Sequence, residues 1–447
     1  MFDRNRQWWL LGALSGVLGL TVLGETIVGV ALLTIRNDLG MTQLASHWVV
    51  NAYLLTFTCF VALGGRLGDK LGHGRVFQAG SALFALASLA AGLAPSGGFL
   101  IAATAVQGIG AATIFPASMA MVTASFSKEK HGTAFGLQTT VGGVFMSSGP
   151  LIGGLFSQVF SWRWIFLINL PIVLAIAFVV LATWRPSDQE IKRARERFDV
   201  TGFLTLFVGL VALVVFLMQG SDWGWTSPAV LGMLVFGIVL MVVFVAVELR
   251  RPDPLIELDL LSIRTFTGGT ISFFVFQFNK IVIFVFLAMF FQEKLGRSPV
   301  AAGLAVMVAI LPTLVTSLIT GRMTDRLGAR VPLIFGYAIN GLAVVLIGLL
   351  SVFDNYWLML PPLIVWGATL PPSSIPARQA LMGAVPRDKH GQASGINLTI
   401  QMLGGTIGMA LCGSILAATG SYQLVFLITG CLILATIAVI WSMVERD

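Results

Sequence analysis

Charged residues are scarce in this sequence. Asp, Glu, Lys and Arg make up 11% of its 447 residues, whereas hydrophobic residues make up 57%. A soluble globular protein carries about 25% charged residues, which cover the surface that faces water. The shortage of charge therefore excludes a soluble globular protein. It predicts an all-α integral membrane protein, because a membrane-spanning helix needs about 20 predominantly apolar residues.

Residues that build catalytic and metal sites are also few. The chain has four histidines, dispersed among different segments: His47, His73, His131 and His390. A membrane enzyme would need His, Asp or Cys side chains clustered near one interface. We therefore expect a protein that is not an enzyme and that holds no metal and no cofactor.

Cysteine is nearly absent as well. The three cysteines, Cys59, Cys412 and Cys431, lie in apolar runs without Cys-x-x-Cys spacing. A structural metal site or a disulfide framework would show regularly spaced cysteines. We expect all three side chains to be packing residues.

The net charge of +7 does not indicate a nucleic-acid partner. Basic residues stand in short gaps between apolar runs, and no Lys/Arg run alternates with polar or aromatic residues in a soluble stretch. A nucleic-acid-binding face shows such a cluster. Basic residues between apolar runs are instead typical of membrane topology.

Fourteen apolar runs are separated by glycine, proline or charged residues, and each is long enough to cross a bilayer. The predicted spans are 8–33, 45–66, 76–94, 98–122, 133–158, 163–184, 200–219, 227–249, 267–291, 300–320, 331–352, 357–380, 392–417 and 421–443. The first run has no cleavage site of small residues, so it is interpreted as a retained span rather than a signal peptide. An even number of spans places both termini on one side of the membrane.

The basic residues predict which side that is. With a cytoplasmic N-terminus, Arg36, Arg163, Lys294 and Arg297 fall on the outer side, Lys280 falls within a span, and all other Lys and Arg are cytoplasmic. Loops rich in Lys and Arg face the cytoplasm. We therefore expect a multi-pass protein of the cytoplasmic (inner) membrane with both termini cytoplasmic.

Two loops share one pattern. Residues 65–75 follow the second span and residues 321–330 follow the tenth, and both read Gly-x-x-x-Asp-basic-Leu-Gly before a final Arg. Glycine permits a tight turn between antiparallel helices, while Asp can face the positive end of a neighbouring helix. We interpret both loops as charged latches that favour one conformation of two rocking halves. The latch residues are Asp69, Arg75, Asp325, Arg326 and Arg330.

The repeated loop divides the chain into six spans, two inserted spans and six further spans. Transporters build two such halves around a central site. The predicted parts are an N-terminal six-helix bundle (1–184), a cytoplasmic loop with two inserted transmembrane helices (185–263) and a C-terminal six-helix bundle (264–447). The loop at 185–199 is interpreted as a solvated loop that sets the topology, with a lipid-headgroup or partner site as the alternative.

With these loops the chain resembles the major facilitator superfamily, whose hallmark loop is Gly-x-Leu-x-Asp-Arg-x-Gly-Arg. Residues 100–112 are similar to the fourth-helix motif of that superfamily, and residues 162–171 with the two extra central spans resemble its fourteen-helix drug:proton antiporter branch. The fifth span looks like the antiporter motif of the exporters at Gly136, Gly149, Pro150, Gly153 and Gly154. The resemblance implies the major facilitator fold, with two six-helix bundles plus two additional central helices, and alternating access around a mid-membrane cavity.

The glycine-rich fifth span also has a physical interpretation. Pro150 removes one helical N–H and permits a kink, and the glycines let a neighbouring helix approach closely. Such a bend shapes the cavity and seals it against proton leak. Ordinary glycine-mediated packing without a further role is the alternative.

The charged residues of the family pattern are missing from their usual places. An Arg is usual where this chain has Thr104 in the fourth span and Gln401 in the thirteenth. In the first span the usual Asp stands one position before Glu25, which corresponds to a rotation of about 100° around the helix. In the fifth span Phe145 replaces the second Gly of the antiporter motif.

Two charged residues lie well inside spans, namely Glu25 in the first and Lys280 in the ninth. A charge at the bilayer centre costs about 2.5–3.5 kcal/mol on insertion scales, so each is a functional candidate. We expect Glu25 to be the proton-coupling residue, because its protonation removes its attraction for a cation. Lys280 is expected to be its counter-charge or an anchor for an anionic group of the substrate. Two alternatives stay open: a Glu25–Lys280 ion pair without coupling, and a Glu25 side chain that snorkels to the outer surface.

Several polar residues in the spans are suited to substrate binding. Helical spacing places Gln277 with Lys280 on a mixed aromatic and polar face that fits a cavity wall. The predicted substrate-binding residues are Lys280, Gln277, Gln107, Thr104, Tyr53, Asn51 and Gln401. Each of the uncharged ones is equally suited to a polar contact between helices.

Together these features predict a secondary active transporter that works by alternating access as a monomer. The expected activity is proton-coupled export (antiport) of amphipathic small molecules or drugs. Its partners are the small-molecule substrate, protons and membrane lipids, and the proton gradient is the energy source. Three alternatives stay open: a proton-coupled carrier of an anionic metabolite or lipid-like substrate, with uptake as one direction; a channel, for which no selectivity filter is visible; and a sensor on the same scaffold.

Overall fold

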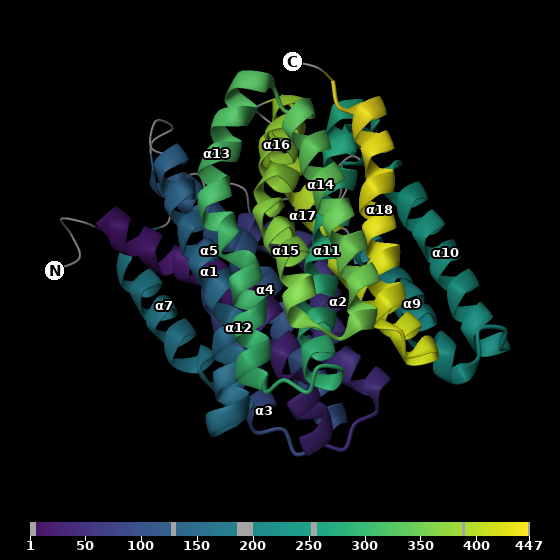
Figure 1. Ribbon diagram of the computed structural model, residues 1–447. Helices are drawn as coiled ribbons and strands as arrows, with labels where there is room; N and C mark the ends of the chain where they lie inside the picture. Colours follow the sequence, from purple (N-terminus) through teal and green to yellow (C-terminus); the bar gives the residue numbers. More distant parts are fainter. Residues whose placement is uncertain (1–5, 127–130, 186–199, 252–256, 387–388, 446–447) are drawn as a thin grey trace. The chain divides into compact units, whose positions relative to one another are not determined.

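The computed structural model describes residues 6–126, 131–185, 200–251, 257–386 and 389–445. Every regular element among these residues is helical (Figure 1). Among the described residues, fourteen helical segments are long and apolar enough to cross a membrane: 6–38, 43–71, 73–92, 97–125, 136–160, 164–183, 201–223, 228–248, 264–293, 299–327, 330–353, 356–383, 392–419 and 422–443. The fourteen predicted spans are therefore confirmed.

The chain divides into two compact units, Met1–Phe203 and Leu204–Asp447. The helices of the first unit are α1 (Arg6–Asp38), α2 (Gln43–Leu71), α3 (His73–Gly92), α4 (Gly97–Ser125), α5 (His131–Leu155), the π-helical turn η2 (Phe156–Phe160), α6 (Trp164–Leu167) and α7 (Asn169–Thr183). Helix α9 (Val200–Trp223) contains the boundary. The three-part division at 184/185 and 263/264 stays a prediction, and residues 186–199 of the expected cytoplasmic loop lie outside the described residues.

The second unit continues with α10 and the remaining spans. Its elements are α10 (Pro228–Glu248), η3 (Leu258–Ser262), α11 (Arg264–Glu293), α12 (Pro299–Ile310), α13 (Pro312–Leu327), α14 (Arg330–Leu350), η4 (Ser351–Phe353), α15 (Tyr356–Ala368), α16 (Leu370–Gly383), α17 (His390–Thr419) and α18 (Tyr422–Met443).

Equivalent spans pack in the same way in the two units. In the first unit α1 packs against α5 and α7, and α3 packs against α4 and α7. In the second unit α11 packs against α17 and α18, and α14 packs against α15, α16 and α18 (Figure 1). Because these partners hold equivalent positions in the two six-span sets, the internal repeat seen in the loops extends to the helix packing.

Proline accounts for two helix breaks within spans. Pro312 begins α13 and separates it from α12, and Pro371 and Pro372 stand at the start of α16, just after its break from α15. Proline has no N–H to continue the ladder and its ring clashes with the preceding turn. Pro150, in contrast, lies inside α5, which continues to Leu155 before the π-helical turn η2. Each broken span exposes backbone carbonyls that other groups must satisfy.

The two repeated loops are shorter than their sequence indicates. Helix α2 extends to Leu71 and α13 to Leu327, so most of each charged stretch is helical. The turns are at Gly72 and Gly328, which occupy matching positions and have φ angles of 93° and 73°. A side chain is strained at such positive φ, whereas glycine is not. The glycines therefore permit the tight turns, as the repeat predicts.

The three cysteines are free, but they do not share one environment. Cys59 and Cys412 are buried, as expected of packing residues. Cys431 is exposed on α18, so the expectation was wrong for this residue. The helix is apolar on all sides, and only the tertiary structure decides which side faces outward.

Candidate functional site

Glu25 lies inside the N-terminal unit. It is 4% exposed and comes from the middle of α1, where it lines a cavity together with residues of α2, α4 and α7. The cavity leaves about 30 Å³ open to the centres of water molecules. One water needs roughly 10–15 Å³ by this measure, so about two waters fit there. An internal, wettable environment does not agree with the alternative in which Glu25 snorkels to the outer surface.

Three predicted polar residues line the same cavity: Tyr53 of α2 and Thr104 and Gln107 of α4. Gln107 Nε2 donates a hydrogen bond of 2.8 Å to Ser88 Oγ of α3, which holds the amide in place. Thr104 Oγ1 donates to the backbone oxygen of Ile101. The structure thus brings Glu25 together with three of the predicted substrate-binding residues.

Asn169 is a further polar residue of this cavity, which the sequence interpretation had not singled out. It begins α7, is 6% exposed and lines the cavity beside Glu25. The sequence offers one signal that could have identified Asn169, namely its place in the stretch 162–171, part of which forms the short helix α6 just before it. Asn51, in contrast, is buried in α2 and is not among the residues that line the cavity.

The glycines of the fifth span bring α5 onto α1 directly beside Glu25. A Cβ added at Gly149 would lie 2.0 Å from Thr26 Oγ1, and one at Gly153 would lie 2.5 Å from the carbonyl oxygen of Ile27. Gly136, in the same predicted motif, has nothing within 4 Å of an added Cβ. Close approach therefore requires glycine at 149 and 153 but not at 136.

The C-terminal unit holds a second group of predicted residues. Gln401 Nε2 of α17 donates to Gln277 Oε1 of α11 at 3.4 Å, and Gln277 is fully buried. Lys280 lies on the same face of α11 and is 7% exposed. The structure thus brings Gln277 and Gln401 together. The Glu25–Lys280 ion pair stays a prediction, because these residues belong to different units.

A buried polar network lies next to Lys280 in sequence. Asn279 Nδ2 of α11 donates to Asn340 Oδ1 of α14 at 2.9 Å, and Trp366 Nε1 of α15 donates to Asn279 Oδ1 at 3.1 Å. Asn340 Nδ2 then donates to the backbone oxygen of Trp366 and to Thr369 Oγ1. The network adds a hydrogen bond to a carbonyl at the break between α15 and α16, which also accepts from the N–H and hydroxyl of Thr369. Sequence periodicity could not reveal it, because its four residues come from three separate spans.

Two of the predicted latch residues, Asp69 and Arg330, contact neighbouring helices. Asp69 Oδ1 lies 3.4 Å from His73 Nε2 at the start of α3, and Arg330 donates to the backbone oxygen of Trp441 while its guanidinium lies 4.6 Å from the Trp441 ring centroid. Arg75 stands on α3 near this turn. Asp325 and Arg326 are exposed on the last turn of α13. The predicted role of these residues in conformational switching stays a prediction.

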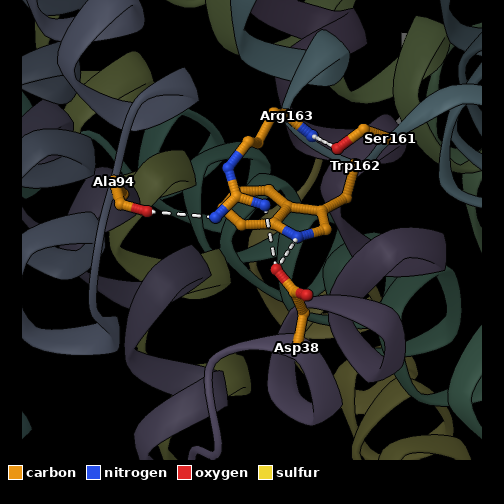
Figure 2. Close-up of polar contacts among 5 residues, drawn as sticks. All are labelled: Asp38, Ala94, Ser161, Trp162 and Arg163. Atoms are coloured by element: carbon orange, nitrogen blue, oxygen red, sulfur yellow. Dashed lines mark hydrogen bonds and ion pairs between the residues drawn. The ribbon is translucent and has the colours of Figure 1, made fainter.

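The stretch 162–171 forms a clamp at the end of α1 (Figure 2). Trp162 Nε1 donates to Asp38 Oδ2 at 2.8 Å, and Arg163 Nη1 donates to the same oxygen at 2.9 Å. The Arg163 guanidinium also donates to the backbone oxygen of Ala94 at 3.3 Å and lies 4.4 Å from the Trp162 ring centroid. One carboxylate thereby joins the end of α1 to the segment before α6, and the arginine reaches the loop between α3 and α4.

The chain resembles known transport proteins over most of its length. It is 35% identical over 409 residues to a cephamycin export protein of Amycolatopsis lactamdurans, which covers 90% of this chain and 83% of that protein. It is 32% identical over 425 residues to a puromycin resistance protein of Streptomyces alboniger, with 93% and 83% covered. A crystal structure of a D-xylose-proton symporter superposes with a TM-score of 0.71 over 98% of both chains at 13% identity, which shows likeness of fold.

The family-level comparison gives the same result. The sequence matches the family model of the Major Facilitator Superfamily over residues 14–252 and 269–447. This range includes the repeated turns, the cavity around Glu25 and both six-span sets. The chain therefore belongs to the major facilitator superfamily, as its loops and motifs indicate.

Proposed function

We propose that this protein exports amphipathic small molecules across the cytoplasmic membrane in exchange for protons. The names of its relatives, which include a cephamycin export protein, a puromycin resistance protein and a multidrug resistance protein of Mycobacterium tuberculosis, support export as the direction. The proton gradient is the energy source, both termini are cytoplasmic and the monomer is the functional unit.

The observation that carries the proposal is the environment of Glu25. A carboxylate buried to 4% exposure shares a small wettable cavity with Tyr53 and Gln107. An ionisable group inside a membrane helix is costly unless it has a function. In its charged form Glu25 attracts a cationic substrate, and in its protonated form it does not, so proton and substrate exchange at one place.

The adjoining glycines give this exchange its structural setting. Gly149 and Gly153 let α5 cover α1 at Thr26 and Ile27, next to Glu25. Tight packing there excludes water on that side of α1 and limits the routes by which protons reach the carboxylate. Proton leak without substrate movement is thereby reduced.

Transport into everted membrane vesicles tests the proposal. With an acidic lumen, puromycin, ethidium and a cephalosporin are offered in turn, and at least one of them accumulates in vesicles that contain the protein. Glu25→Gln abolishes accumulation driven by the pH gradient, whereas the matched variant Asp222→Asn, which changes an exposed carboxylate at the end of α9, retains it. Full proton-driven accumulation in Glu25→Gln would overturn the role of Glu25. No gradient-driven accumulation of any compound would contradict proton-coupled export itself.

A further inference from the structure

Arg378 is a cation inside a membrane-spanning segment. It lies in α16, within the span Tyr356–Gly383, five residues before the end of the helix. At 1.5 Å per residue this places its Cα about 7 Å from that end. The sequence interpretation counted Arg378 with the basic residues that set the topology. A guanidinium within a span is costly, so a topogenic role alone does not account for its position.

The side chain of Arg378 lies over an aromatic ring. Its guanidinium is 5.4 Å from the ring centroid of Phe273 on α11, a residue that is 1% exposed. Phe273 is itself braced by an edge contact with Phe276, with 6.1 Å between the centroids. Stacking of this kind orients the planar guanidinium and leaves the N–H groups at its edge available.

Among the residues that the structure describes, none forms a hydrogen bond or an ion pair with Arg378, and the residue retains exposed surface. A guanidinium prefers a planar anion that accepts two parallel hydrogen bonds, such as a carboxylate, a sulfonate or a phosphate. The stacked arginine is thus set up for an anion that no described residue supplies.

The ring under Arg378 belongs to the polar face of α11. From Phe273 that face continues one turn on to Gln277, which is bonded to Gln401, and then to Lys280. Seven residues of helix separate Phe273 from Lys280, which corresponds to a rise of about 10 Å. A guanidinium therefore stands at one end of this face, an ammonium at the other and an amide pair between them.

We propose that Arg378 forms an anion-binding subsite on the C-terminal unit, which takes the carboxylate, sulfonate or phosphate of an amphipathic substrate. The inference rests on the proposed export function and deepens it, because among the exported compounds those that also carry an acidic group gain this second contact. The apolar part of such a compound packs against the partly exposed Phe276 ring, while its acidic group binds the guanidinium edge. A phospholipid headgroup offers the same chemistry, so the test separates the two sources.

Direct binding tests the subsite without transport. The full-length protein in phosphatidylcholine nanodiscs is titrated with 1-pyrenebutyric acid and with its primary amide, which differ in charge but not in ring system. Arg378→Gln weakens binding of the acid about tenfold and leaves binding of the amide unchanged. Arg378→Lys gives an intermediate loss, because the charge remains but the planar fork is gone. The matched control Arg250→Gln, an exposed arginine after α10, binds both compounds as the original protein does.

Three outcomes would overturn the proposal. An equal loss for acid and amide would assign Arg378 a purely structural role, and an unchanged affinity for the acid would remove it from binding. If nanodiscs with phosphatidylglycerol abolish acid binding in the original protein, the site belongs to a lipid headgroup.

Should Arg378→Gln fail to fold, Phe273→Leu, which removes the stacking surface but no charge, must weaken acid binding selectively by about threefold. The two proposals can fail separately. If Arg378→Gln loses acid binding as expected but vesicles with the original protein show no transport, the export function is refuted and the subsite is not.

Discussion

Gly149 of α5 lies so close to Thr26 of α1 that a Cβ at residue 149 would be 2.0 Å from Thr26 Oγ1. Thr26 follows Glu25 directly, and its hydroxyl donates to the backbone oxygens of Val22 and Leu23 on the preceding turn. The contact therefore sets how closely α5 covers α1 at the predicted proton-coupling residue. The glycine is needed here because even a methyl group has no room.

Gly149→Ala should destabilise the protein and reduce transport. An added methyl in a packed interface costs about 1–3 kcal/mol, since helices or side chains must shift. Gly136→Ala is the matched control, because nothing lies within 4 Å of its added Cβ, and it should behave as the original protein does. Thermal unfolding in detergent and accumulation in vesicles provide the measurements. Adding Thr26→Ala to Gly149→Ala should restore part of the stability, and no restoration would mean that the contact is not the cause.

The Asp38 clamp should stabilise the N-terminal unit mainly through Trp162. Trp162→Phe removes a donor to a carboxylate and should cost about 1 kcal/mol in free energy of unfolding. Arg163→Gln should cost less, because the Arg163 and Asp38 side chains are 35% and 47% exposed and exposed ion pairs contribute about 0.2–1 kcal/mol. In an Asp38→Ala background the effect of Trp162→Phe should shrink. A double-mutant cycle followed by thermal unfolding measures this, and fully additive losses would argue against the clamp.

Asn340 should be among the most sensitive residues of the C-terminal unit. Asn340→Leu leaves the Asn279 Nδ2 group without its acceptor in a buried site, at a cost of about 1–3 kcal/mol. Thr369→Ser keeps the hydroxyl and should be nearly neutral, whereas Thr369→Val should destabilise. Melting temperatures of the purified variants decide between these expectations. Equal stability of the Val and Ser variants would show that the hydroxyl does not matter.

The predicted topology can be measured with single cysteines. All three native cysteines are first replaced by alanine, because Cys431 is exposed. A cysteine at position 297, between α11 and α12, should react with a membrane-impermeant maleimide in intact cells. A cysteine at position 250, after α10, should react only after the membrane is opened. The reverse pattern would invert the orientation assigned from the basic residues.

Part of the candidate site was predictable from the sequence. Glu25 was identified because a charge in an apolar helix is costly unless it has a use, and Gln107 because it lies in the stretch that is similar to the fourth-helix motif. The structure shows that both residues line one cavity with Tyr53 and Thr104, because the helices that carry them pack together within the N-terminal unit. Asn169 and the Asn279–Asn340 pair could not be predicted, because each depends on which side chains of distant helices face one another.

The sequence by itself determined the membrane environment, the fourteen spans and the repeat, because these depend on composition and on short-range patterns of apolar, glycine and charged residues. Only the tertiary structure decided that Cys431 faces outward, that the charged loops are mostly helical, and that Gly149 but not Gly136 lies against α1. Nearly every side of these helices is apolar, so hydrophobicity hardly distinguishes one face from another. Close packing of specific side chains makes that choice, and it depends on residues far apart in the chain.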